Sequence, residues 1–252
     1  MKKYIFAAML LIISAGAFAQ HSEYTDGDSH IGFNIAYANP TLRETLYKDQ
    51  EKATVTSLNG IKAGVVYETS IVKGFGLQLG LNYTFGTKLG KLTGKNEAGT
   101  TFKSKEDIMY HQIEIPVDWQ YKFEVAKETY LLLYTGPTIE MGLGFSKNTT
   151  RQQINPATGK IEDITLKQDL YKQMYANKTD YDEDGIADKY RRLNVTWGVG
   201  AGFQYQRYFI RGGYDFGIFN PYNDVFNNNS DFRRKARFDQ WSLKLGIYLW
   251  NF

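Results

Sequence analysis

A strict alternation of apolar side chains with small or polar ones recurs along this chain, and its clearest example runs from Gly74 to Phe85. One face of this stretch carries Phe75, Leu77, Leu79, Leu81, Tyr83 and Phe85, and the other carries Gly, Gln, Asn and Thr. A period of two predicts a β-strand. The stretch is about twice as long as the ~5–6 residues usual in soluble sheets and suits a tilted bilayer crossing of ~9–11 residues. Because only helices and closed barrels satisfy every backbone group in hydrocarbon, the pattern predicts a transmembrane β-barrel with an apolar outer face.

Eight stretches of this kind are separated by connections that alternate between long and short. We expect strands at 30–38, 58–68, 74–85, 108–123, 130–145, 193–205, 208–218 and 238–249. The long polar connections are 39–57, 86–107, 146–192 and 219–237. Short periplasmic turns and long extracellular loops are typical of outer-membrane barrels. The sequence therefore predicts an all-β protein, an eight-stranded antiparallel up-and-down transmembrane β-barrel with both termini on the periplasmic side.

A soluble barrel of the lipocalin kind is the alternative fold. Its apolar face would point into the barrel and its outside would be polar. Here the second face consists of Gly, Asn, Gln, Lys and Glu, which would form a poor core in the absence of lipid. This favours the membrane barrel.

The first residues resemble an export signal. Lys2 and Lys3 form a basic start, residues 4–13 an apolar core, and residues 17–19 an A-x-A cleavage site. We expect a signal peptide at 1–19 and the barrel domain at 20–252. A membrane-anchoring helix, the competing interpretation, needs about 20 apolar residues. The chain has no Cys, which excludes a lipid-anchored Cys and a disulfide framework.

Composition agrees with a barrel in the outer membrane. The mean hydropathy of -0.44 is low for a membrane protein, as expected where lumen and loop residues dilute the lipid-facing ones. The net charge of +3 would fall to +1 with the loss of Lys2 and Lys3, which gives no support to nucleic-acid binding. An aromatic content of 15% fits aromatic girdles at the two membrane interfaces.

Five short segments of the expected strands form recognisable motifs: Glu114-Ile115-Pro116-Val117, Leu131-Leu132-Leu133 with Gly136-Pro137, Gly198 to Phe203, Arg211 with Tyr214 to Gly217, and Leu243 to Gly246. Together they resemble the PorT-like outer-membrane β-barrel family of Bacteroidetes-type bacteria. In this chain Gly212-Gly213 separates Arg211 from Tyr214, where the family usually has Arg next to Tyr. The resemblance implies the fold and the outer-membrane location, and does not assign an activity.

Ionisable residues on the predicted inner face are the first candidate site. They include Lys62, Glu114, Asp118, Glu140, Arg211, Asp215 and Lys244, together with Glu68 and Gln78. One interpretation is a path for protons or ions, because ionisable groups at membrane depth are often functional. The other is a plug of ion pairs, because eight strands leave room for little more than side chains. Pro116 and Pro137 lie on adjacent strands, where they predict a bulge or a bend; a lateral gate for lipid is the alternative.

The longest loop contains a second candidate, a D-x-D-x-D-G sequence. Asp180, Asp182, Asp184, Ile186 and Asp188 occupy positions 1, 3, 5, 7 and 9 of a calcium-loop pattern, with Gly185 at position 6. Position 12 is Arg191, where a bidentate acid belongs, so the pattern predicts weak Ca²⁺ binding. The alternative is an acidic loop tip with Asp-Gly turn chemistry.

Three functions remain open. The first is a structural or accessory envelope component that acts through its surface loops, the second a narrow channel for ions or small solutes, and the third a membrane-embedded enzyme. The three His residues show no catalytic or metal-ligand spacing, so we expect no enzyme. The expected partners are outer-membrane lipid, lipopolysaccharide and an envelope protein, with Arg233, Arg234, Lys235 and Arg237 as candidates for lipopolysaccharide phosphates.

Overall fold

The computed structural model describes residues 29–45, 53–91, 93–97, 100–154, 159–174, 186–222 and 235–251. All regular structure in these ranges is β. The strands are β1 (Ser29–Thr45), β2 (Thr54–Ser57), β3 (Asn59–Val72), β4 (Phe75–Lys88), β5 (Thr93–Glu97), β6 (Thr100–Ala126), β7 (Thr129–Ile154), β8 (Ile161–Asp169), β9 (Lys172–Met174), β10 (Ile186–Asp188), β11 (Leu193–Tyr205), β12 (Tyr208–Gly217) and β13 (Lys235–Asn251). No helix in the described ranges has the length and apolarity to cross a membrane.

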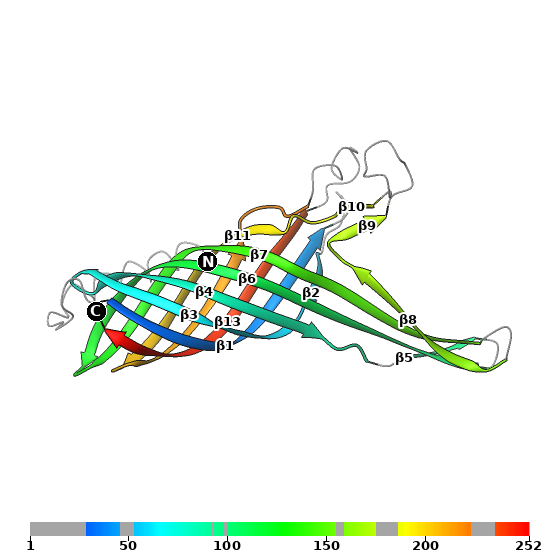
Figure 1. Ribbon diagram of the computed structural model, residues 1–252, viewed down its shortest axis with the longest axis horizontal. Coiled ribbons are helices and arrows are strands. Elements are labelled where there is room, and N and C mark those ends of the chain that lie inside the picture. Colours follow the sequence, from blue (N-terminus) through cyan, green and yellow to red (C-terminus); the bar gives the residue numbers. More distant parts are fainter. Residues whose placement is uncertain are drawn as a thin grey trace.

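Eight of these strands close into a ring in which every pairing is antiparallel (Figure 1). Around the ring, each strand pairs with the next in the order β1, β3, β4, β6, β7, β11, β12 and β13. Pairing of β1 with β13 completes the ring. The predicted eight-stranded up-and-down barrel is therefore confirmed, and β11 has the predicted bounds.

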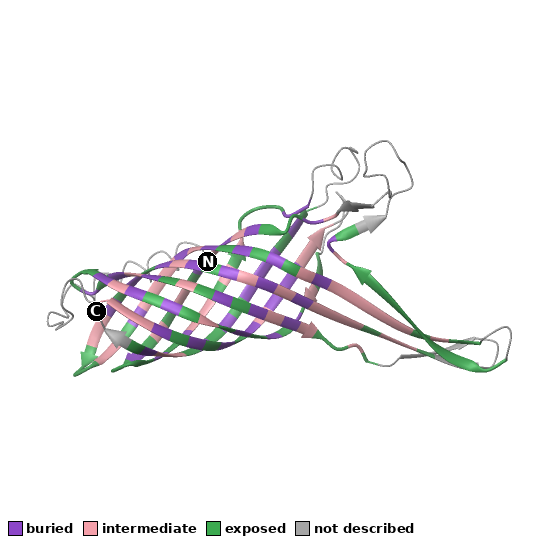
Figure 2. Ribbon diagram, in the orientation of Figure 1, coloured by how far each residue is buried: buried purple, intermediate pink, exposed green. Residues whose placement is uncertain are grey.

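Burial alternates along the barrel strands as the sequence pattern requires (Figure 2). Neighbouring residues of β4 illustrate it: Leu79 is 37% exposed on the outer face and Gln78 is 1% exposed in the interior. The apolar residues thus lie outside and the polar ones inside, which is the reverse of a soluble barrel.

Tight connections define one end of the barrel, which we call the turn end; we call the opposite end the loop end. At the turn end, Lys73 and Gly74 have φ angles of 35° and 82°, and Glu128 and Gln206 have φ angles of 56° and 53°. Positive φ at the central positions matches hairpin turns whose twist fits the flanking strands.

Register near the carboxyl terminus explains the parity of the last residues. The β1–β13 pairing shifts between Ile31, opposite Trp250, and Gly32, opposite Tyr248. Asn251 stays in the sheet opposite His30. A bulge near Trp250 therefore changes which side of the sheet the last residues face. Phe252 and the predicted signal peptide at 1–19 lie outside the described residues.

An arm projects beyond the loop end of the barrel (Figure 1). It consists of the outer parts of β6 and β7, which are 27 and 26 residues long, flanked by β5 and β8. The prediction that 86–107 and 146–192 are loops is therefore wrong for much of their length. The ladder between Ser104 and Arg151 continues the β6–β7 hairpin outward. Its polar, Thr-containing sequence needs no buried face, so hydrophobic periodicity did not reveal it.

The two prolines interrupt pairing without changing register. Between β4 and β6 the ladder lacks the pairs between Leu79–Val117 and Asn82–Glu114, and both flanking pairs keep the same register. Pro116 pairs with Thr138, next to Pro137, so the two prolines lie at one level as expected. A Cβ on Gly80 would lie 2.8 Å from Cγ of Pro116, which shows that the ring packs over this glycine. Of the predicted bulge or bend at the prolines, the bulge is wrong, because the nearest register shift in β6 lies at His111–Gln112.

Candidate functional site in the barrel interior

The ring brings the predicted inner-face residues together in its interior. Lys62, Glu114, Asp118, Glu140, Arg211 and Lys244 are buried, and Asp215 is half-buried. They form two hydrogen-bonded networks, one near the turn end and one near the loop end, with a third group of charges between them.

The network near the turn end is centred on the carboxylate of Glu68. Nζ of Lys122 and the hydroxyl of Tyr248 donate to it, and Nη2 of Arg211 lies 3.2 Å from its Oε2. Arg211 also donates to Gln78 and Gln120, each at 2.6 Å. Fully buried charges are stable only when they are paired and hydrogen-bonded, and this network provides both.

The network near the loop end is centred on Glu114. Its carboxylate forms an ion pair with Lys62 and accepts hydrogen bonds from Gln112 at 2.6 Å and Gln240 at 3.2 Å. On the next strand, Glu140 accepts from Asn194 at 2.9 Å and from Thr196 at 3.2 Å. Glu114 and Glu140 are direct neighbours in the β6–β7 register.

Asp118, Asp215 and Lys244 lie between the two networks and interact electrostatically. The ring of Tyr134 lies in the same part of the interior as these three residues, with its centroid 5.4 Å from the guanidinium of Arg211. Its hydroxyl and Cζ occupy the space that a Cβ on Gly200 would need. The bare inner face of β11 thus accommodates a bulky neighbour.

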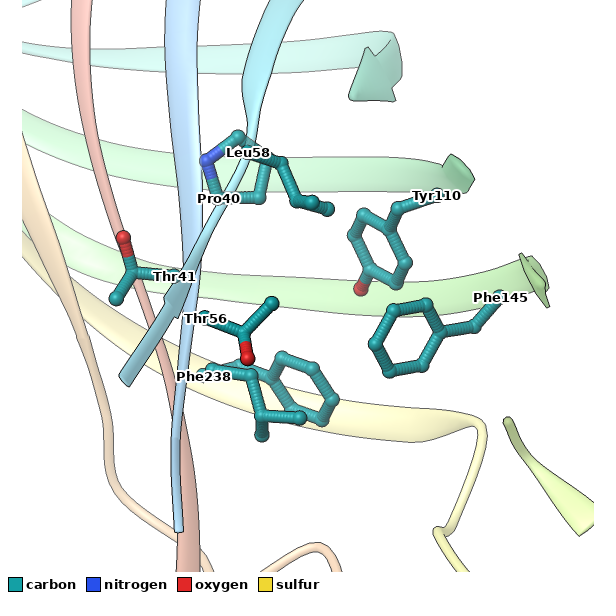
Figure 3. A pocket seen from close by; sticks show the side chains of 8 residues that line it. Pro40, Thr41, Thr56, Leu58, Tyr110, Phe145 and Phe238 are labelled. Carbon is teal, nitrogen blue, oxygen red and sulfur yellow. The ribbon is translucent and has the colours of Figure 1, made fainter. Parts of the chain in front are cut away.

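Aromatic side chains close the interior at the loop end and form what we call the aromatic cap. Its buried members are Leu42, Leu58, Tyr110, Phe145, Tyr171, Tyr190, Tyr222, Ala236 and Phe238. Figure 3 shows Tyr110, Phe145 and Phe238 facing one another across the interior, and the Tyr110 and Phe238 rings stack with centroids 6.0 Å apart. Burial raises the pKa of the Tyr171 hydroxyl to about 12, so this residue is neutral.

The Glu44 carboxylate holds the loops of the cap together. It lies near the end of β1, seven residues beyond Tyr37, which marks the end of that strand's outward apolar series. The Tyr190 hydroxyl donates to it, the Tyr222 hydroxyl donates at 2.7 Å, and Nζ of Lys189 lies 3.3 Å away. Burial raises the pKa of Glu44, but the Tyr190 hydrogen bond, the Lys189 charge and the Tyr222 hydrogen bond outweigh it, and the net pKa is lowered.

Small cavities lie in the described part of the interior. Two of about 10 Å³ lie near the aromatic cap, one lined by Pro40, Leu58, Tyr110 and their neighbours (Figure 3) and the other extending to Glu140 and Gln240. Each is about the size needed for one water molecule. Side chains thus fill the interior, as the plug interpretation expects.

Several important residues were not identified from the sequence. Lys122 and Tyr248 lie on the inner parity of their strands and could have been included on that signal. Tyr171, Tyr190 and Tyr222 come from connections, where parity gives no information.

The other candidate sites are described only in part. Asp180, Asp182 and Asp184 lie outside the described residues, whereas Ile186 and Asp188 belong to β10, which pairs with β9. Groups of three or more His, Cys, Asp or Glu side chains able to hold a metal do not occur in the described ranges. Arg233 and Arg234 are also outside these ranges, and Arg237 forms an ion pair with Asp239 at 2.8 Å.

Comparison with known proteins identifies one matching family. A family model described as "Outer membrane protein beta-barrel domain" matches residues 18–223. Among solved structures, Ail of Yersinia pestis, crystallised with the heparin analogue sucrose octasulfate, is 12% identical with a TM-score of 0.35, covering 89% of this chain and 100% of that one. Neisserial surface protein A is 10% identical with a TM-score of 0.32, covering 86% and 97%. No curated protein matches the chain.

Proposed function

Because the chain belongs to the outer membrane protein β-barrel domain family, we propose that it is a non-conducting component of the outer membrane that contacts another envelope protein through its arm. The loop end then faces the cell exterior and the turn end the periplasm. We also propose that the chain belongs, within this family, with the PorT-like barrels, because its motifs around Glu114 and Gly198 resemble theirs.

The observation that carries the non-conducting part is the filled interior. The Glu68 network, the Glu114 network and the aromatic cap lie one after another along the barrel, and the cavities near the cap have room for one water molecule each. An ion would have to break several charge-assisted hydrogen bonds to pass. The proposal also assigns the chain no enzymatic activity.

The arm supports the second part of the proposal. Within the described residues, β8 pairs with β7 along one edge only. Leu166 and Ile161 on β8 are 59% and 50% exposed. An exposed strand edge offers unpaired backbone donors and acceptors to another chain, and an extended partner segment can add to it as a further strand.

Lipopolysaccharide is a further proposed contact, through exposed arginines at the loop ends of β1 and β13. Arg43 and Arg237 lie on either side of Asp239, each 2.8 Å from it, and are 41% and 49% exposed. Guanidinium groups held in this way present remaining donors that suit phosphate oxygens.

Conductance across a planar lipid bilayer tests the first part. The reconstituted protein is expected to give no steady open state, while a general porin in the same bilayer gives one. A channel for ions or small solutes is the alternative function, favoured by the ionisable residues of the interior. Steady conductance of the wild-type protein would establish that alternative and reject ours.

Crosslinking in intact cells tests the second part. A photoreactive residue at Leu166 on the arm is expected to capture an envelope protein. The matched control is Leu143, which is 45% exposed on β7. Capture at Leu143 and not at Leu166 would contradict the proposed role of the arm.

A further inference from the structure

One of the small cavities has an unusual lining. It lies directly below the aromatic cap, has a volume of about 10 Å³, and is lined by Pro40, Tyr110, Gln112, Glu140, Phe238, Asp239 and Gln240. These residues include two carboxylates, two amides and a phenol, and no Lys or Arg. Oxygen-bearing side chains, two of them carboxylates, therefore form the polar part of a lining that Pro40 and Phe238 complete.

The charge of Glu140 is not balanced locally. Glu114 faces Glu140 in the register of β6 and β7, and like charges in that position repel each other. Lys62 pairs with Glu114, whereas Glu140 accepts from the neutral groups of Asn194 and Thr196. Among the described residues, no ion pair to Glu140 is formed within 4.0 Å. The other carboxylate of the lining, Asp239, already pairs with two arginines.

A second, independent observation concerns Gln240. This residue is 3% exposed and donates its Nε2 hydrogen to Glu114. Its Oε1 is buried and has no hydrogen-bond partner among the described residues. A buried acceptor without a partner is costly, so an unpaired oxygen and an unbalanced carboxylate border the same small cavity.

The charged residues of the barrel interior, counted together, also leave an excess of negative charge. Apart from Asp239, whose two arginine partners are half-exposed, the interior between the cap and the turn end contains the acids Glu68, Glu114, Asp118, Glu140 and Asp215 and the bases Lys62, Lys122, Arg211 and Lys244. If all are ionised, the interior carries one excess negative charge.

We propose that this cavity binds one small monovalent cation, with Na⁺ as the physiological occupant, between the Glu140 carboxylate and the Gln240 Oε1. Hard cations take oxygen ligands such as carboxylates and amide carbonyls. One positive charge balances Glu140, and the volume of about 10 Å³ admits one small ion. The ion would also fix the β6–β7 register at the point where the two glutamates face each other.

Thallium provides the direct test. Crystals of protein that was refolded and crystallised in a thallium(I) salt, so that the ion is present before the barrel closes, are expected to show an anomalous peak in the cavity, between Glu140 and Gln240. Absence of this peak in well-ordered crystals, or a peak only at other positions, overturns the proposal.

Sodium-dependent stability tests the same site in solution. The unfolding midpoint in detergent is measured while Na⁺ replaces N-methylglucamine at constant ionic strength. The wild-type midpoint is expected to rise with the logarithm of sodium concentration above the dissociation constant. Glu140→Gln, which removes the unbalanced charge, is expected to abolish this rise. Glu162→Gln on the arm is the matched control and is expected to keep it.

A second variant guards against failure of the first to fold. Gln240→Met removes the unpaired oxygen at similar volume and is expected to shift the sodium response to higher concentration. A wild-type midpoint that depends on pH but not on sodium would mean that a proton occupies Glu140, and one that depends on neither would mean a bound water; both results reject the cation. If neither variant folds, the thallium map of the wild-type protein decides.

Discussion

The Glu68 carboxylate is shared by two buried cations, and this arrangement predicts unequal effects of two substitutions. Lys122 and Arg211 both contact Glu68, and all three side chains are at most 1% exposed. Glu68→Gln replaces the shared anion with a neutral amide and leaves two positive charges in the interior. Lys122→Met removes one cation and leaves a one-to-one pair of Glu68 with Arg211.

The structure gives the expected magnitudes. Removing one partner of a buried ion pair typically costs about 3–5 kcal/mol, which we assign to Glu68→Gln. Lys122→Met keeps the aliphatic packing and relieves the burial of a charge. It also leaves Gln204 Oε1 without the hydrogen bond of 2.6 Å that Lys122 donates; an unpaired acceptor costs about 1–3 kcal/mol. We expect Glu68→Gln to be the more destabilising by about 2 kcal/mol, roughly 30-fold in the unfolding equilibrium.

Urea unfolding in lipid vesicles measures these costs, with the mobility of unheated protein on an SDS gel reporting the folded fraction. The double variant Glu68→Gln/Lys122→Met is expected to be more stable than Glu68→Gln alone, because the second change removes one of the two unbalanced cations. Equal costs for the two single variants, or a double variant whose cost is the sum of both, would show that charge balance around Glu68 does not determine stability.

Three further predictions concern the outer face, the cap and the long loop. Leu79→Arg should lower the free energy of unfolding by about 2–4 kcal/mol, because it places a charge near the membrane midplane. Leu166→Arg on the arm should change the free energy of unfolding by less than about 0.5 kcal/mol. Equal effects of the two variants in urea unfolding would contradict the assignment of Leu79 to the lipid-facing side. The pKa of Glu44 is lowered from 4.5, so the stabilisation that its carboxylate gives to the cap should be present above pH 4.5 and lost as pH falls through the folded-state pKa. Protease cleavage of the cap loops should therefore increase with acid in the wild-type protein. In Glu44→Gln, cleavage should be independent of pH. Calorimetry should detect weak calcium binding that disappears in Asp182→Ala/Asp184→Ala. The absence of saturable heat in the wild-type protein would favour the alternative interpretation, an acidic loop tip that binds no calcium.

The barrel could be predicted from sequence because successive side chains of a strand point to opposite faces of the sheet. Leu79 and Gln78 are adjacent, and their opposite character specifies which side of the wall each occupies. The same parity placed Lys62, Glu114 and Arg211 in the interior. The pairings among them depend on strand register and on side-chain length, which a single sequence does not specify.

The cap and the arm could not be predicted in this way. Tyr190 and Tyr222 reach Glu44 from two different connections, and their proximity arises only when the ring closes. The outer part of β7 is polar on both faces, so its strand character lacks the alternation on which the prediction relied. Hydrogen bonding to β6 and β8, rather than burial, keeps it extended.

The continuity of β6 and β7 from the arm into the barrel wall has a mechanical consequence. Their ladder runs from Ser104–Arg151 on the arm to Ala126–Thr129 at the turn end, and its hydrogen bonds lie perpendicular to the strands. A partner that pulls one of these strands along its axis would load many of the bonds at once in shear. A partner that separates β8 from β7 sideways would load them one after another. We therefore expect an attachment through the arm to resist tension along the barrel wall and to release when peeled from its edge.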